Sequence, residues 1–108
     1  MTIVYVTKQS APLATTETDL YTVPAATLAK ISTITVCNRG NTATTFRISL
    51  SVGGGATANK DYWYYDNVIP PNDTFARTCG DIANAGDKLR VYAGNASLSF
   101  NLSSQETS

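Results

Sequence analysis

Histidine is absent from all 108 residues of the chain. It is the commonest general base and metal ligand near neutral pH, so the usual catalytic triads and zinc sites have no basis here. Two cysteines would need carboxylate partners to hold a metal, and no ligand-like spacing occurs. The eight acidic residues fall mostly in expected turns, where aspartate commonly bonds its own backbone. We therefore expect no enzymatic activity, no metal and no cofactor.

Charge is also scarce. Charged residues make up 15% of the chain, and eight basic residues balance eight acidic ones. Proteins that track nucleic acid or are held by charge on an anionic membrane need a strong electrostatic field, so neither partner is expected. The apolar run at residues 3–6 is too short for the apolar segment of a signal peptide or for a membrane span. The sequence thus predicts synthesis in the cytoplasm of the producing cell.

Only two cysteines are present, Cys37 and Cys79. In a reducing cytosol they are expected to remain thiols and to behave as small apolar residues. A disulfide between them is the alternative, and the sequence leaves it open.

No window carries the apolar stripe at i, i+3, i+4 and i+7 that a helix of three turns requires. Apolar and polar residues alternate instead, most clearly from Phe46 to Val52 and from Leu98 to Ser103. Turn residues separate these segments. The expected strands are 2–7, 20–23, 30–38, 46–52, 62–69, 74–79, 88–93 and 97–103. Because crossover helices are missing, we predict an all-β protein: a single antiparallel β-sandwich of about seven or eight strands, either a jelly roll or an immunoglobulin-like sandwich.

We expect the N-terminal segment to be distinct from the sandwich domain. Residues 1–9 are expected to form a strand or arm, residues 10–102 the sandwich domain, and residues 103–108 a flexible C-terminal tail. The apolar residues Ile3, Val4, Tyr5 and Val6 are candidates for contact with another protein, because an extended segment can add a strand to a neighbouring sheet. The alternative is an eighth strand within the chain's own sandwich.

A run of three glycines, Gly53 to Gly55, ends five residues before Lys60. A phosphate-binding loop needs its lysine followed by serine or threonine at the start of a helix. Lys60 is followed instead by Asp61 and an aromatic strand. We therefore interpret the glycines as a flexible connection between two strands.

Four aromatic residues follow: Tyr62, Trp63, Tyr64 and Tyr65. Strand alternation predicts that Trp63 and Tyr65 share one face and that Tyr62 and Tyr64 share the other. One pair is expected to fill the core. The other either covers neighbouring strands or forms an exposed patch for a protein or a sugar, since Tyr and Trp supply large, rigid contact area. Alternation does not say which pair faces outward.

Several segments together carry a likeness to known proteins. They are Ser10–Thr16 leading into Asp19–Ala25, Val36–Gly40, Thr42–Ile48, Tyr64–Asp66 with Ile69–Pro70 and Asn72–Phe75, and Ala85–Ala93 with Leu98–Phe100. This pattern resembles the small β-sandwich structural proteins of tailed bacteriophages over about residues 10–102; Leu-Tyr-Thr-Val-Pro and Cys-Asn-Arg are its most particular elements. The resemblance implies a virion component of the head surface, neck or tail, without catalytic residues. The strand at residues 2–7 departs from the pattern.

Three hypotheses follow. The first is a capsid decoration or cement protein of the virion, a homo-oligomer with a trimer favoured, that binds across neighbouring major capsid subunits. The second is a neck, tail or fibre-attachment adaptor that binds other virion proteins. The third is a carbohydrate-binding module, in which Trp63, or Tyr62 with Tyr64, stacks on sugars while Asp61 or Asp66 bonds their hydroxyls.

Overall fold

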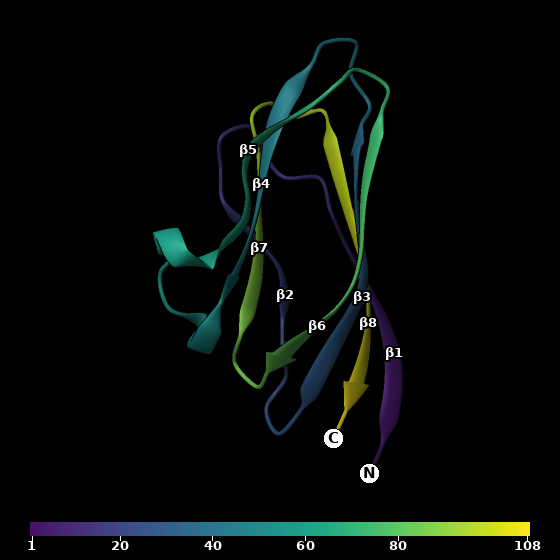
Figure 1. The fold of residues 1–108 in the computed structure, drawn as a ribbon, viewed down its shortest axis with the longest axis vertical. Helices are drawn as coiled ribbons and strands as arrows, with labels where there is room; N and C mark the ends of the chain where they lie inside the picture. The colour runs from purple at the N-terminus through teal and green to yellow at the C-terminus, as the bar shows by residue number, and fades with distance from the viewer.

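The computed structural model describes residues 1–108, except for the side chain of Cys79. Over these residues the chain forms eight strands and two short 3-10 helices (Figure 1). Their order is β1 (Ile3–Ser10), β2 (Thr18–Thr22), β3 (Leu28–Asn38), β4 (Thr44–Ser51), η1 (Val52–Gly54), η2 (Asn59–Asp61), β5 (Tyr62–Ile69), β6 (Thr74–Asn84), β7 (Lys88–Ala93) and β8 (Leu98–Thr107). The all-β class and each expected strand are confirmed.

The strands form two four-stranded antiparallel sheets with the orders β1-β8-β3-β6 and β2-β7-β4-β5. The pairs β4·β5, β3·β6, β2·β7 and β1·β8 are nested, as if one long hairpin had been rolled up. In an immunoglobulin-like sandwich the first strand lies beside the second, whereas here it lies beside the last. The nested order is that of a jelly roll, which decides between the two predicted sandwiches.

The core lies between the sheets and is built by alternation along the strands. On β8 the side chains of Leu98, Phe100 and Leu102 are fully buried, and Leu89, Val91 and Ala93 of β7 face them from the other sheet. Strand β3 shows why alternation alone misplaces residues. Its pairing shifts between Ile31 and Thr33 against both neighbours, and such a bulge reverses the phase of the side chains.

Both ends of the chain belong to the sandwich, which corrects the expected tail. Residues 103–107 continue β8 and pair with β1 on one side and β3 on the other. Figure 1 shows the yellow end of β8 between purple β1 and blue β3, with both termini close together. Thr2 and Ser108 exchange backbone hydrogen bonds of 2.8 and 2.9 Å. Strand β1 is therefore an eighth strand of its own sandwich, and its outer edge is the place to look for a partner.

Candidate functional site: the β1 edge and the opposite aromatic surface

Each sheet has two edges, and three of the four carry features that discourage another strand from pairing. Strand β2 has five residues and a bulge between Asp19 and Tyr21. Strand β5 has two register shifts, and β6 is bulged opposite Ile31/Thr33. Strand β1 has eight residues in constant register and a single charge, Lys8. Bulges, shortness and charge are the usual protection of an edge, so β1 is the unprotected one among the described strands.

The register of β1 shows which backbone groups of this edge are unpaired. Thr2 and Ser108 exchange both of their hydrogen bonds, so they form a hydrogen-bonded pair. The register has no shift from this pair to the pair of Ser10 with Phe100, because each step forward along β1 is one step back along β8. Hydrogen-bonded pairs therefore fall on the even residues of β1. The odd residues Ile3, Tyr5, Thr7 and Gln9 direct their N–H and C=O groups away from β8, along the open edge.

The side chains of β1 are apolar and accessible. Tyr5 is 78% exposed, and Ile3 and Val4 are each nearly half exposed, while Val6 packs against the core. An open pocket of about 290 Å³ lies beside Tyr5 and Val6 and extends over β8 to Ser103. Apolar side chains on both faces of an edge strand give a joining strand something to bury, in addition to the backbone bonds.

Behind β1, a hydrogen bond ties the two sheets together. The hydroxyl of Tyr21 in β2 donates to the carboxylate of Glu106 in β8, which is the residue opposite Val4. Tyr21 is almost fully buried, and this burial, together with the hydrogen bond to Glu106, raises the pKa of its phenol. The bond holds the end of β8 on which β1 rests.

We expect the stability of the fold to decline with alkali through this residue. The folded pKa of Tyr21 lies above its unfolded value of 10.0, so its contribution is complete below pH 10 and is lost as the pH rises above that value. Tyr21→Phe should lower the free energy of unfolding at neutral pH by about 1 kcal/mol and flatten its decline above pH 10. Urea denaturation at a series of pH values measures both effects. An unchanged alkaline slope in the variant would contradict the assignment.

The four aromatic residues of β5 do not alternate as predicted, because the strand is bulged twice. Tyr62 pairs with Ser49 and Tyr64 with Ile48, and these two partners are adjacent in β4, so Trp63 is an extra residue on β5. The second shift includes Asp66, whose φ of 51° is left-handed. Each shift changes the phase. Tyr62 and Tyr65 therefore come together with ring centroids 4.9 Å apart, and the predicted grouping of Trp63 with Tyr65 is wrong.

Tyr65 belongs to an outward surface that contains a stacked arginine. The Arg47 guanidinium lies 4.2 Å from the ring centroid of Tyr65 and 4.3 Å from that of Tyr92. Its Nε donates to Asp66 Oδ1 at 2.7 Å, and this hydrogen bond lowers the pKa of the Asp66 carboxyl. We call Arg47, Tyr62, Tyr65, Asp66 and Tyr92 the tyrosine–arginine surface. Tyr65 is 56% exposed, so a large aromatic face is available to a partner.

Trp63 and Tyr64 are only partly buried and pack against the core. The Tyr64 ring makes an edge contact with Phe75 at 5.0 Å, and the Arg77 guanidinium lies 4.7 Å from the centroid of the Trp63 ring. These two residues thus connect β5 to β6 across the sandwich, which makes them mainly structural. Among the four predicted aromatic candidates, only Tyr65 is exposed, and half-buried Tyr62 lies beside it.

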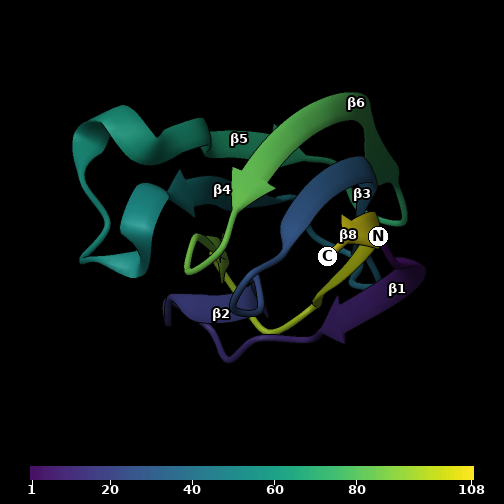
Figure 2. The same cartoon turned by 90° about the horizontal axis from the view of Figure 1, so that it is seen from below.

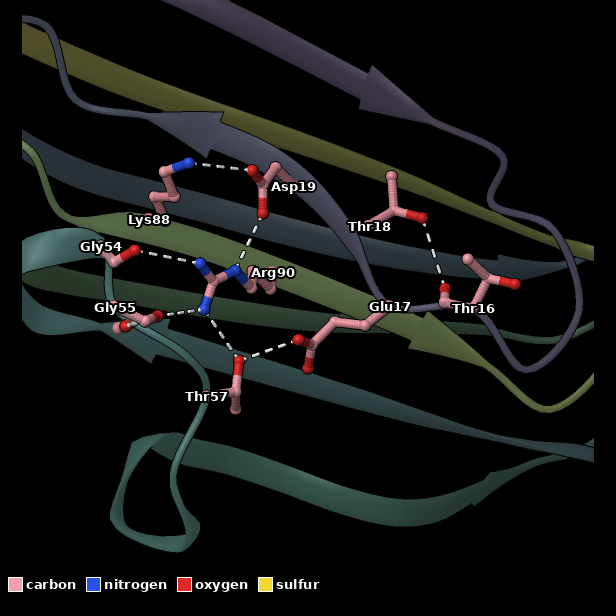
Figure 3. A network of polar contacts seen from close by, with 10 residues as sticks. Thr16, Glu17, Thr18, Asp19, Gly54, Gly55, Thr57, Lys88 and Arg90 are labelled. Atoms are coloured by element: carbon pink, nitrogen blue, oxygen red, sulfur yellow. Dashed lines mark hydrogen bonds and ion pairs between the residues drawn. The ribbon is translucent and has the colours of Figure 1, made fainter.

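The glycine-rich connection between β4 and β5 is held to the sheet by Arg90 of β7 (Figure 3). The guanidinium donates to the carbonyl oxygens of Gly55 at 2.6 Å and Gly54 at 3.2 Å, and to Asp19 at 2.9 Å. The bond from Arg90 lowers the pKa of the Asp19 carboxyl. This connection is therefore fastened to β7 by hydrogen bonds from Arg90 to two of its backbone carbonyl oxygens.

A hollow of about 690 Å³ lies between this connection and strands β4 and β5. Its walls include Leu50, Lys60, Asp61 and Trp63. The volume is within the range of small-molecule sites.

The described residues contain no cluster of three or more potential metal ligands, and no helix among them is long and apolar enough to cross a membrane. Cys37 is a free thiol. The predicted disulfide alternative also involves the side chain of Cys79, which lies outside the described part of the chain.

Two members of the tyrosine–arginine surface, Arg47 and Tyr92, were missed by sequence reasoning. Alternation places both on the polar side of their strands, but only the pairing of Arg47 with Tyr92 across β4 and β7 brings them together.

Comparison with models of protein families finds no match, and a search of curated proteins finds no significant match.

Proposed function

We propose that this protein is a structural component of a bacteriophage virion, a head decoration or cement protein that strengthens the shell by contacts between chains. The observation that carries the proposal is the β1 edge, which is long, regular, apolar and almost uncharged. Exposed edges of this kind are rare in proteins that act alone, because they promote association. The resemblance of residues 10–102 to phage structural proteins supports the same conclusion.

A cement protein must hold at least two neighbours, and the fold supplies two contact surfaces. The β1 edge is at one side of the sandwich, beside β2, and β5 is at the opposite end of the other sheet. Figure 2 shows β1 at the right and the β4–β5 connection projecting at the left. The tyrosine–arginine surface is built on β4, β5 and β7 of the sheet that does not contain β1, so it is separate from the β1 edge. Two separated surfaces allow one molecule to contact two chains at once.

The jelly roll adds support by analogy alone. Jelly rolls occur in viral capsid proteins, in lectins and in cupins, so the architecture is compatible with a virion role without requiring it. Attachment by strand addition and aromatic burial needs no catalytic group, and it would operate without charge steering.

Binding to particles that lack the protein tests the proposal. We expect the purified protein to bind such particles and to raise their resistance to heat. Ile3→Asp should weaken binding about tenfold, because it replaces a buried apolar contact with a charge. Ile82→Asp is the matched control: Ile82 is 49% exposed on the β6 edge of the same sheet and Ile3 is 45% exposed. Equal loss in both variants, or no binding of the wild-type protein, would contradict the proposal.

The place of the protein in the particle separates a decoration protein from an adaptor of the neck, tail or fibre attachment. Labelled protein spread over the whole head, in hundreds of copies, supports decoration. A few copies at one vertex would favour the adaptor, which uses the same two surfaces.

A carbohydrate-binding module is the second candidate, and the hollow beside Trp63 is the observation that favours it. An indole ring can stack on a sugar, while Asp61 and Lys60 can bond its hydroxyls. A glycan array tests this directly. Specific binding that Trp63→Ala abolishes and Tyr5→Ala preserves would establish the site, and absence of any glycan signal would remove it.

A further inference from the structure

We propose that the chain joined at the β1 edge is a second copy of this protein, bound through antiparallel pairing of β1 with β1 about a two-fold axis at Tyr5. The inference rests on the proposed function, because it names the partner of the same edge. The pair would extend β1-β8-β3-β6 into one sheet that continues through both molecules.

The chemistry of β1 suits pairing with itself. An interface between two copies of one strand is isologous. Each charged residue therefore lies opposite a residue of an identical strand that runs in the opposite direction. Lys8 is the one charged residue between Ile3 and Ser10. In most registers, including the one proposed here, it meets an uncharged residue, so no like charges oppose each other. If the partner strand had a different sequence, β1 could carry more charged residues, because the partner could supply the opposite charges.

The open backbone groups limit the possible registers. Ile3, Tyr5, Thr7 and Gln9 must hydrogen-bond to odd residues of the partner, because these residues carry the unpaired groups. An axis at Tyr5 pairs Ile3 with Thr7 and Tyr5 with Tyr5. It also places Val4 directly opposite Val6 in a close, non-hydrogen-bonded pair.

Neighbouring registers are less favourable. An axis at Val6 would place Lys8 against Val4. An axis at Val4 would pair only residues 3–5 of β1 with one another, whereas the axis at Tyr5 pairs residues 3–7. The axis at Tyr5 places Tyr5 opposite Tyr5 and Val4 opposite Val6. Among the apolar residues of β1, only Ile3 then lies opposite a polar residue, Thr7. Lys8 lies opposite Thr2, a polar residue just before β1.

This dimer would change how the protein binds a shell. Each molecule keeps its tyrosine–arginine surface, which lies on the sheet without β1, so a dimer presents two of these surfaces. Two linked surfaces bind a repeating lattice more tightly than one, since the second contact is intramolecular. The two-fold pair closes after two copies, so this proposal differs from the trimer expected from the sequence.

Mixed disulfide formation tests the register. Two variants, Val4→Cys and Val6→Cys, are prepared in chains whose Cys37 and Cys79 are replaced by serine. The Cα atoms of a close antiparallel pair are about 4.5 Å apart, within the range that a disulfide spans. We expect a cross-linked dimer when the two variants are mixed under oxidising conditions, and little when either is oxidised alone. A cross-link in Val6→Cys alone would show the axis at Val6 and overturn the proposed register.

The mass in solution tests the dimer itself. The wild-type protein should sediment at twice the 11.5 kDa of one chain over a wide concentration range. Tyr5→Lys places two ammonium groups at the axis and should yield monomers, whereas Val68→Lys, at an exposed valine of the β5 edge, should leave the dimer intact. A monomeric or trimeric wild-type protein would overturn the inference. If that protein still bound particles, with Val4→Cys cross-linked to the coat protein, the proposed function would stand without the dimer.

Discussion

Asn38→Ala is expected to lower the free energy of unfolding by about 3 kcal/mol, a large part of the stability of a domain of this size. Asn38 is the last residue of β3 and is 0% exposed. Its side-chain amide donates to the carbonyl oxygens of Thr42 at 2.9 Å, Pro70 at 3.1 Å and Ile69 at 3.3 Å. Alanine leaves these three acceptors, one in a buried and two in partly buried hydrogen bonds, without this donor.

The other half of the same amide binds a third connection. Asn38 Oδ1 accepts hydrogen bonds from the backbone N–H of Gly40 at 2.9 Å and from the Ser97 hydroxyl at 3.0 Å. One side chain thus joins the β3–β4, β5–β6 and β7–β8 connections at one end of the sandwich. This gives the Cys-Asn-Arg element a structural reason that the sequence alone did not show.

Asn67→Ala is the matched control, because Asn67 is exposed on β5. Its cost should stay within about 0.5 kcal/mol. Urea unfolding of both variants measures the difference. A loss below about 1 kcal/mol for Asn38→Ala would show that the three connections are held by other contacts.

Gly54→Ala is expected to cost about 3 kcal/mol for two separable reasons. Gly54 has a φ of +77°, a conformation that residues with a Cβ rarely adopt. A Cβ at this position would also lie 2.6 Å from the backbone oxygen of Gly86, which cannot move aside as a side chain can. The β4–β5 connection would therefore have to move away from the turn between β6 and β7, which contains Gly86.

The two neighbouring glycines separate these causes. Gly53 has a φ of +82° but open space around its Cβ position, so Gly53→Ala should cost about 1 kcal/mol from strain alone. Gly55 has an ordinary φ of −71° and equally open space, so Gly55→Ala should change stability by less than about 0.5 kcal/mol. Thermal or urea unfolding of the three variants should rank them in this order. Equal losses at Gly53 and Gly54 would show that the approach to Gly86 is relieved without cost.

The sequence indicated the residues of the β1 edge, but it indicated the tyrosine–arginine surface only in part. Ile3, Val4, Tyr5 and Val6 were selected from an apolar run, and the structure places them on an edge strand. The run could not show whether that strand was central or at an edge, since strand order depends on pairing between distant segments. Of the aromatic residues, Tyr65 lies on the exposed face, but its partners Arg47 and Tyr92 come from strands far away in the chain.

Alternation by itself determined that this chain is all-β and located all eight strands, because a half-buried strand repeats every two residues and that period is visible locally. It did not determine the continuation of β8 beyond residue 103, where Ser103, Ser104 and Gln105 carry no apolar signal and are held by pairing on both sides. Only the tertiary structure decided which aromatic rings face outward. A bulge adds one residue against a neighbouring strand and reverses every side chain after it, and the need for that residue arises from the neighbour, not from the strand's own sequence.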